Sequence, residues 1–569
     1  MVNNNQPEKR LGRRSLLSGA AAAAGGAALA TTVPAGAHAA PKPKPAAGAA
    51  GAASVTATPG IIDVPPTDPR FPDLVRGTNQ RWVANPEKVR MVTTPTQAET
   101  AVQDAVTAGK RLTVRSGGHC YEDFVFNSQV QIVVDLSAMN QVYYDPAMNA
   151  FAIEAGASNL QVYETLYKLY GVTLPAGSCH SVGAGGHISG GGYGLLSRQL
   201  GLTVDYLHAV EVVVVRSNGT VETVRASRDS TGELKDLWWA HTGGGGGNFG
   251  LITRYWMRTP GATGTDPTAL LPKPPSEVFL NAISLPWPQM DQRDFETLVK
   301  NWGRWHAANS APDSPYAGLF GLLKLNANAG TGSSIGLITQ MDAVTHPNAR
   351  TLLNNYLTEI TAGVSITPQA MTSPMGEHAA LPGFDKTRRL PWYIATDYLS
   401  GGNPTLYGKY KSSYARQALP SFQIAALWQH LSAPQPDGLE ALVQIDSYGC
   451  KVNTVASDAT AVPQRDSVLK LQYQAYWTDP AKEATGLAWI RNLYKAVYAE
   501  TGGVPVPNFT NDGCYVNYPD KDLGDPAFNT SQETWGSLYY KANFARLKTA
   551  KRAWDPTNFF RHAQSIPLQ

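Results

Sequence analysis

Hydrophobic and polar residues alternate in short blocks through the first half of the chain, and glycine-rich turns separate the blocks. Thr96 stands three residues before Glu99 and a glycine follows at 109, which predicts an amphipathic helix. A hairpin is predicted around Ser217-Asn218-Gly219, because apolar runs flank this turn. Such irregular alternation favours an α+β fold over a doubly wound parallel sheet. The predicted strands are 111–115, 131–136, 141–144, 150–155, 209–216 and 220–224, and the predicted helices are 96–109 and 159–170.

The pattern changes near residue 259, where Pro260–Pro275 is rich in proline, threonine and glycine. Longer blocks with more aromatic residues follow, and the last segment, 503–569, returns to short elements. The length and this change predict two domains, of which the second holds an antiparallel sheet flanked by helices. Its predicted strands are 279–285, 318–325, 335–342 and 439–448, and its predicted helices are 295–308, 346–360, 405–418 and 481–502.

The most unusual stretch of the sequence is 171–194, in which nine of twenty-four residues are glycine. Glycine costs backbone entropy inside helices and strands, so the stretch is predicted to be neither. It is expected to provide unusual backbone conformations or a close approach to a cofactor, with Cys179 at its edge.

A second glycine-rich turn, Ser116-Gly117-Gly118-His119, follows the predicted strand 111–115. Consecutive backbone N–H groups in such a turn form a concavity that binds phosphate without a lysine. Gly245–Gly250 satisfies the G-x-G-x-x-G pattern, but a β-like run follows it where a dinucleotide-binding helix would begin. The sequence therefore argues against a Rossmann domain.

The first 39 residues are typical of a twin-arginine export signal, with Arg13-Arg14 before a mild apolar run and Ala37-His38-Ala39 at its end. The apolar run is short and interrupted by glycine, which makes it a poor membrane span. Residues 40–67 are rich in proline and alanine and are predicted to be a linker. We therefore expect a secreted protein whose folded part begins near Pro69.

The net charge and the spacing of cysteine and histidine residues exclude several classes of binding partner. The chain carries a formal charge of +3, and removal of residues 1–39, with four basic and one acidic residue, leaves it neutral. This argues against nucleic acid or an anionic membrane as a partner. The four cysteines are too few and too widely spaced for a disulfide scaffold or a zinc site, and no histidine pair has metal-ligand spacing, so no metal is expected.

Three motifs in order carry a resemblance to a known family. They are Val114-Arg-Ser-Gly-Gly-His119-Cys-Tyr-Glu122, Pro175-Ala-Gly-Ser-Cys179-His-Ser-Val-Gly-Ala-Gly-Gly-His187, and Asn517-Tyr518-Pro-Asp520 followed by Tyr539-Tyr540-Lys-Ala-Asn543. From about Asp68 onward the chain resembles the berberine-bridge-enzyme branch of the vanillyl-alcohol-oxidase flavoprotein family. The resemblance implies a two-domain α+β fold, with a discontinuous FAD-binding domain at 68–260 and 503–569 and a substrate domain at 261–502.

The resemblance also implies FAD held at two points, by His119 through the flavin 8α-methyl group and by Cys179 through ring carbon 6. Imidazole and thiolate are both nucleophiles that can add to an electron-poor ring system. Cys120 is assigned a structural role. The sequence does not decide whether Cys450 and Cys514 form a disulfide. The other residues expected at the cofactor are Arg115, Ser116, Gly117, Gly118, Gly183, Gly186, His187, Gly192, Tyr193, Gly194, Ile252 and Asn517.

For catalysis, the family transfers a hydride from a substrate carbon to flavin N5 while a base takes the hydroxyl proton. Tyr518 matches the tyrosine with that role, and Tyr448 matches a second tyrosine associated with a further dehydrogenation. A phenol has an ordinary pKa of about 10, so positive charge or hydrogen bonding must favour its anion. Lys451 and Arg465 are the candidates by nearness in sequence.

The resemblance therefore predicts an oxidase that reduces O2 to hydrogen peroxide. Its expected substrate is an alcohol or amine on a bulky, glycosylated or polycyclic natural product. An oligosaccharide oxidase that converts a reducing-end sugar to its lactone is the alternative. A third hypothesis, from another class, is a flavin-containing protein that sequesters a drug for self-resistance.

Overall fold

Three β-sheets organise the protein in a computed structural model that describes residues 60–330, 332–402 and 406–569. The first sheet contains β1 (Ile62–Val64), β2 (Lys88–Met91), β4 (Ile132–Asp135) and β3 (Leu112–Arg115), in that order. Strands β2, β4 and β3 run parallel to one another, and β1 is antiparallel to β2. The predicted export signal lies outside the described residues.

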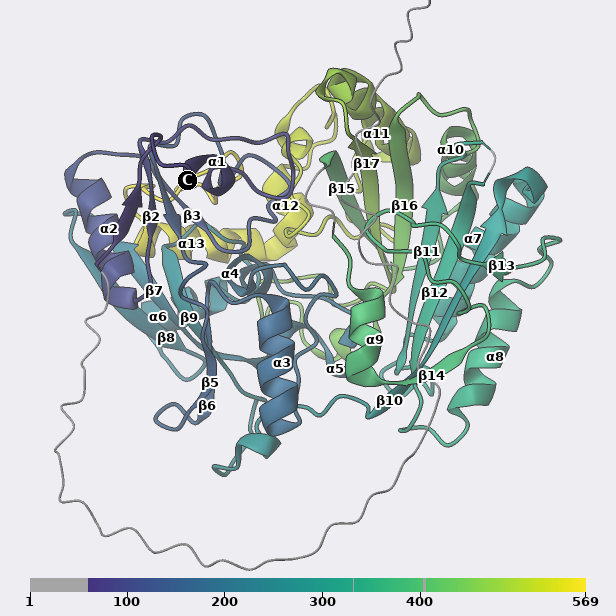
Figure 1. Ribbon diagram of the computed structural model, residues 1–569, viewed down its shortest axis with the longest axis horizontal. Helices are drawn as coiled ribbons and strands as arrows, with labels where there is room; N and C mark the ends of the chain where they lie inside the picture. The colour runs from purple at the N-terminus through teal and green to yellow at the C-terminus, as the bar shows by residue number, and fades with distance from the viewer. Residues whose placement is uncertain (1–59, 331, 403–405) are drawn as a thin grey trace, which may run out of the picture. The chain divides into compact units, whose positions relative to one another are not determined.

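The second sheet has five antiparallel strands in the order β5 (Val142–Asp145), β6 (Ala150–Glu154), β9 (Leu251–Met257), β7 (Leu207–Val215) and β8 (Val221–Ser227). Around these two sheets lie α1 (Phe71–Leu74), α2 (Pro95–Thr107), α3 (Asn159–Tyr170), α4 (Ala184–Ser189), α5 (Ser197–Leu200) and α6 (Gly232–Ala240). Near the end of the chain, α12 (Trp535–Tyr540) and α13 (Phe544–Trp554) follow, and α13 packs on α6. The last segment therefore returns to the first part of the fold (Figure 1).

The third sheet has eight antiparallel strands. Its order is β13 (Gln369–Ala370), β10 (Glu277–Pro286), β12 (Ser334–Asp342), β11 (Leu319–Asn326), β16 (Leu439–Ser447), β17 (Leu469–Trp477) and β15 (Tyr407–Ala415), with β14 (Arg388–Pro391) also paired to β10. The helices α7 (Gln292–Ala308), α8 (Ala349–Ile360), α10 (Ser421–Leu431) and α11 (Glu483–Val497) pack together on one face, and α9 (Trp392–Leu399) contacts β10 and β14. Figure 1 shows the four helices on the side of this sheet that is turned away from the other two sheets.

Most sequence predictions of these elements are confirmed. Helix α3 ends at Gly171, which adopts the left-handed conformation (φ +67°) that favours glycine. The hairpin of β7 and β8 turns at Gly219, and a strand, β9, follows the glycine run 245–250 as expected. The predicted helix at 96–109 begins earlier, at Pro95, because Thr94 accepts the capping hydrogen bond.

One predicted helix is wrong. Residues 407–415 form the strand β15, which pairs along its whole length with β17. Lys409 and Lys411 alternate with Tyr410 and Tyr414, and all four side chains are buried. A strand buried on both faces lacks the usual alternation of apolar and polar residues. The sequence pattern therefore does not reveal it as a strand.

Two other predictions need correction. The linker predicted to reach residue 67 ends earlier, because Ile62–Val64 forms β1 and Asp63 pairs with Lys88 and Arg90 of β2. The glycine stretch 171–194 was expected to contain no helix, but it contains the short helix α4. Glycine is required in α4 by space, since a Cβ at Gly185 would lie 2.8 Å from the Ala155 carbonyl oxygen.

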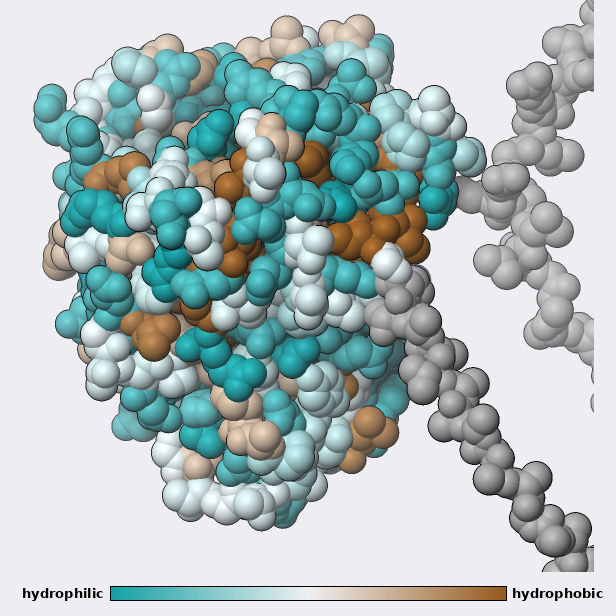
Figure 2. Space-filling view, turned by 90° about the vertical axis from the view of Figure 1, so that its left-hand side faces the viewer, coloured by the Kyte–Doolittle hydropathy of each residue, from teal (hydrophilic) through white to brown (hydrophobic). Residues whose placement is uncertain are grey.

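On the face shown in Figure 2, hydrophilic residues predominate and hydrophobic residues gather in separate patches. Within residues 60–330, 332–402 and 406–569, no helix is long and apolar enough to cross a membrane.

Candidate active site

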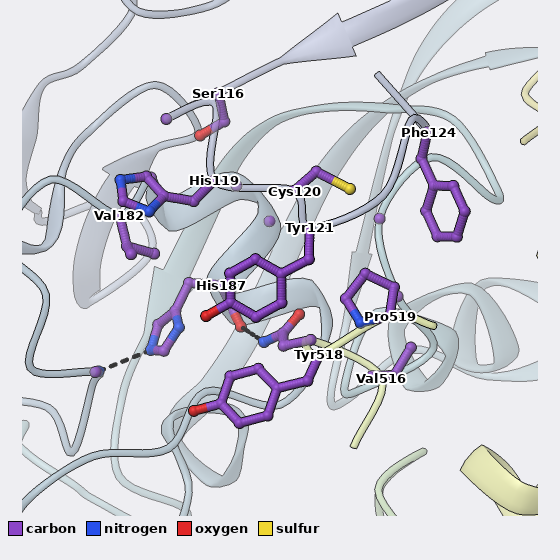
Figure 3. A pocket seen from close by; sticks show the side chains of 18 of the residues that line it. Ser116, His119, Cys120, Tyr121, Phe124, Val182, His187, Val516, Tyr518 and Pro519 are labelled. Carbon is purple, nitrogen blue, oxygen red and sulfur yellow. Dashed lines mark hydrogen bonds between the residues drawn. The ribbon is translucent and has the colours of Figure 1, made fainter. Parts of the chain in front are cut away.

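A cavity of about 330 Å³ lies between the two glycine-rich loops, the C-terminal segment and the eight-stranded sheet. Figure 3 shows its lining from the histidine loop and from 516–519. It brings together most of the residues that the sequence assigned to the cofactor or to catalysis. These are Arg115, Ser116, Gly117, Gly118, His119, Cys179, Gly183, Gly186, His187, Tyr193, Gly194, Ile252, Asn517 and Tyr518.

The loops that carry His119 and Cys179 touch backbone to backbone. A Cβ at Gly117 would lie 2.3 Å from the Gly183 nitrogen, and a Cβ at Gly183 would lie 2.2 Å from the Gly117 nitrogen. His119 Nε2 lies 3.0 Å from the hydroxyl of Ser181, which links the loops a second time. Glycine is therefore needed at both positions to bring the two predicted attachment residues to one cavity.

The C-terminal segment is joined to the same loops through His187 and Asn517. Asn517 donates a hydrogen bond of 2.9 Å to the His187 carbonyl oxygen, and His187 Nε2 accepts one of 2.9 Å from the Gly177 N–H (Figure 3). A Cβ at Gly190 would lie 1.9 Å from Asn517 Oδ1, so this glycine makes room for the asparagine.

Two predicted site residues that the structure describes, Gly192 and Tyr448, do not line the cavity. Gly192 has a left-handed backbone (φ +71°), and a Cβ there would lie 2.3 Å from Thr203 Oγ1, so packing against Thr203 requires glycine at this position. Tyr448 is fully buried behind Tyr193, and its hydroxyl donates a hydrogen bond of 3.2 Å to the Gln464 carbonyl oxygen. The predicted catalytic role of Tyr448 therefore has no support from this geometry.

Tyr518 lines the cavity, and its hydroxyl contacts the buried cation Lys470. Lys470 donates a hydrogen bond of 3.0 Å to its hydroxyl and one of 3.1 Å to Asp446. Burial raises the pKa of Tyr518 well above its ordinary value, and the carboxylate of Asp446 adds to the shift. The phenol is therefore protonated at neutral pH, and Lys470 is the group placed to stabilise its anion.

Lys451 and Arg465, the two cations suggested by the sequence, do not line the cavity. Arg465 pairs with Asp205 at 2.7 Å, and its charge acts on Tyr448. Lys470 was missed because it lies on β17, a strand that the hydrophobic pattern does not reveal.

Tyr121 also lines the cavity, although sequence reasoning missed it. Its ring centroid lies 5.6 Å from that of Tyr518 and 3.5 Å from that of Tyr410, on which it stacks. In Figure 3 the hydroxyls of Tyr121 and Tyr518 point the same way, whereas the thiol of Cys120 points to the other side. Tyr121 follows the predicted attachment residue by two positions, which was the available signal.

The sheet presents a polar face to the cavity. Gln444 and Asp446 on β16 face Gln472 and Lys470 on β17 in direct register. Gln444 donates a hydrogen bond of 2.7 Å to Asp446, and Gln472 donates one of 3.1 Å to the Tyr121 hydroxyl. Buried amides and a carboxylate in this arrangement can bind the hydroxyl groups of a substrate.

The cavity fits FAD. Its volume is in the range of ligand pockets, a Cβ built at Gly186 would meet no atom within 4 Å, and Arg115 Nε is buried without a hydrogen-bond partner. Burial, together with the charge of Arg115, lowers the pKa of His119 to about 4, so its imidazole is neutral and nucleophilic at neutral pH.

The other cysteines and possible metal ligands add no second centre. All four cysteines, which lie in the described ranges, are free, so Cys450 and Cys514 are not joined. Burial raises the pKa of Cys120 to about 12, which suits a structural thiol. No group of three or more histidine, cysteine or acidic residues in the described chain is arranged to hold a metal ion.

A buried ionic cluster stands behind the site. The Lys409 ammonium contacts the Glu122 carboxylate and lies 2.7 Å from Asp520 Oδ1, and all three side chains are at most 3% exposed. Burial lowers the pKa of Lys409, but Asp520 and Glu122 more than offset this, so the pKa is raised and the charge is kept. Glu122 follows His119 by three residues and Asp520 follows Tyr518 by two. One cation therefore joins the loop of His119 to the loop of Tyr518.

Two family models match the chain. Residues 86–225 match the FAD binding domain, and residues 514–567 match the model described as berberine and berberine like. The first range contains both glycine loops and the second contains Tyr518. The fold and the cavity thus define an FAD-linked oxidoreductase with a two-domain vanillyl-alcohol-oxidase-like fold.

Individual oxidases are similar to this chain over most of its length. The aclacinomycin-N/aclacinomycin-A oxidase of Streptomyces galilaeus is 43% identical over 97% of this chain and 98% of its own, and the hexose oxidase of Chondrus crispus is 35% identical over 90% and 95%. The crystal structure of a glycopeptide hexose oxidase complexed with teicoplanin has a TM-score of 0.83 and 45% identity, covering 90% of this chain and 99% of that one. The chain belongs to the berberine-bridge-like family of FAD-linked oxidases.

Replacement of Lys409 by methionine should destabilise the protein strongly, because it leaves the carboxylates of Glu122 and Asp520 buried beside one cation fewer. We expect a loss of about 3–5 kcal/mol in the free energy of unfolding, measured by denaturant titration. Lys88→Met is the matched control, because Lys88 pairs with Asp63 where both side chains are more than 30% exposed, and it should cost about 0–1 kcal/mol. Equal losses in the two variants would contradict this account of the cluster.

Proposed function

We propose that the protein is a secreted oxidase of an alcohol (or amine) group on a bulky, glycosylated natural product. In this proposal FAD is attached through His119 and Cys179, O2 is reduced to hydrogen peroxide, and residues 1–39 direct twin-arginine export. The observation that carries the proposal is Tyr518 with Lys470 and Asp446, at the cavity that both attachment residues line.

The chain's own residues account for the proton in this reaction. When bound, FAD supplies the acceptor for a hydride from the substrate carbon. Tyr518 takes the proton of the substrate hydroxyl, and the Lys470 ammonium, 3.0 Å from its oxygen, stabilises the phenolate form needed for that step. Asp446 holds Lys470 in place, and the closed packing of β16 and β17 excludes bulk water behind it.

The substrate class is inferred from the polar sheet face and from the relatives. Gln444, Asp446 and Gln472 line the cavity with amide and carboxylate groups, which are able to bind the hydroxyls of a sugar. Tyr121, whose ring stacks on Tyr410, adds an aromatic side chain to the same lining. The relatives named for aclacinomycin, for hexose and for a glycopeptide hexose support the same class.

A substrate panel tests the proposal and separates the alternatives. Flavin bleaching without oxygen and peroxide release in air would be measured with glycosylated polyketides and glycopeptides, free hexoses, and cellulose and chitin oligomers. We expect the glycosylated natural products to bleach the flavin fastest. Faster turnover of the oligomers would favour the oligosaccharide oxidase, and bleaching by no compound would favour drug sequestration.

The attachment residues can be tested separately from activity. Wild-type protein should keep its yellow colour after acid precipitation, and His119→Ala or Cys179→Ala should each leave one attachment, detected by the mass of the flavin peptide. The double variant should release its flavin. Cys120→Ala is the matched control and should keep both attachments, because its thiol points away from the predicted contact. Free FAD from acid-treated wild type would contradict double attachment.

Tyr518→Phe should slow flavin reduction by roughly 10²- to 10⁴-fold, the usual contribution of a positioned base, with little change in substrate affinity. Stopped-flow measurement of reduction at several substrate concentrations separates the two quantities. Tyr448→Phe is the comparison, because Tyr448 lies outside the cavity lining, and it should have a much smaller effect. A reduction rate unchanged in Tyr518→Phe would remove Tyr518 as the base.

The reduction rate should rise with pH. Burial raises the pKa of Tyr518 well above its ordinary value, so the phenolate fraction grows about tenfold for each pH unit from roughly pH 6 to 9. Lys470→Met removes the stabilising cation, raises the pKa further, and should lower the rate at every pH in this range. A rate that levels off near neutral pH in the wild type would argue against a phenolate base.

A further inference from the structure

Cys179 touches a carboxylate that the reaction proposed above does not use. Its sulfur donates a hydrogen bond of 3.7 Å to Glu377 Oε2. Glu377 belongs to the segment between β13 and β14 of the substrate domain, so the contact joins the two domains. Its other oxygen, Oε1, accepts a hydrogen bond of 3.2 Å from the Tyr476 hydroxyl, which holds the carboxylate in place.

Two hydrogen bonds to the Cys179 sulfur favour its anion, but burial outweighs them. Hydrogen bonds from the Gly401 backbone and from Ser178 both favour the thiolate. A Cβ at Gly401 would lie 3.4 Å from the sulfur and 3.2 Å from the Cβ of Glu377, so glycine lets the backbone approach both residues. Burial, and then the nearby carboxylate of Glu377, raise the pKa of Cys179 far above its ordinary value. A base must therefore take the thiol proton before the sulfur can react.

Glu377 is the carboxylate in position for this step. Asp446, another carboxylate of the cavity lining, is engaged by Lys470 and Gln444. Burial raises the pKa of Glu377, which makes its carboxylate a stronger base than an exposed one, although the charge of Lys324 opposes the shift.

We propose that Glu377 is the general base that removes the thiol proton of Cys179 during attachment of FAD, so that the chain catalyses its own second flavin linkage. The inference rests on the double attachment in the proposed function. It assigns to the substrate domain a part in building the flavin site, because Glu377 comes from that domain.

The step balances with O2 as the oxidant. Glu377 takes the proton from sulfur, and the thiolate forms a bond to carbon 6 of the flavin ring. The hydrogen of carbon 6 leaves as a proton, and two electrons stay on the ring. O2 takes these electrons and two protons to give hydrogen peroxide, which returns the ring to its oxidised form with the new C–S bond.

The test uses the His119→Ala background, in which Cys179 is the one attachment expected. Apoprotein would be mixed with FAD in air, and attachment followed by the flavin that stays with acid-precipitated protein and by the mass of the Cys179 peptide. Glu377→Gln should slow attachment at least about tenfold. It should still bind FAD that acid releases, which shows that the variant is folded.

Glu211→Gln is the matched control, because Glu211 is also a buried glutamate, 8% exposed, but it bonds to Thr253 and not to Cys179. Its attachment rate should equal that of the background. An unchanged rate in Glu377→Gln overturns the proposal. If Glu377→Gln binds no FAD, the test passes to Glu377→Asp, whose carboxylate is one methylene further from the Cys179 sulfur. Flavin attachment should then be slower than in the His119→Ala background. An attachment rate equal to that of the background would overturn the proposal.

No attachment at Cys179 in His119→Ala with Glu377 intact would instead overturn the double attachment in the proposed function. The two failures are therefore distinguishable. An anaerobic sample adds a further check, because with Glu377 present the ring should stay reduced after the bond forms, and its absorbance should return when air is admitted.

Discussion

The ammonium of Lys409 lies between two carboxylates from opposite ends of the sequence, and the site depends on this contact. Glu122 belongs to the loop of His119, Asp520 to the loop of Tyr518, and Lys409 to β15 of the eight-stranded sheet. Each charge is too deeply buried to be stable alone, so the three segments are strongly favoured to meet at this point. Because His119 and Tyr518 are three and two residues from these carboxylates, the same contact sets where the two functional loops lie.

Burial acts on the functional groups in opposite ways. It favours the neutral imidazole of His119, which is the reactive form, but it also favours the neutral forms of Cys179 and Tyr518, which are the unreactive ones. The latter two residues therefore need partners from the substrate domain. Lys470 contacts Tyr518, and Glu377 contacts Cys179. Residues of the substrate domain are therefore placed to act on the protonation of groups that lie in the other domain.

Site residues could be predicted from the sequence where they form short motifs of neighbouring residues. The glycine loops, His119 and Cys179 form local motifs, and they meet at one cavity as predicted. Tyr518 could be located from its motif, but its cation could not, because Lys470 comes into contact only through the register of β16 and β17. For the same reason the motif of Tyr448 did not reveal that its ring lies outside the cavity lining and packs against Tyr193.

The central claim is that His119 and Cys179 face one flavin, across loops that Gly117 and Gly183 bring into contact. Mass spectrometry of proteolysed wild-type protein under denaturing conditions tests it most directly. The account predicts one species in which the peptides of His119 and Cys179 are joined through a single FAD. Both peptides recovered without flavin, or flavin on one of them with the other unmodified, would contradict it.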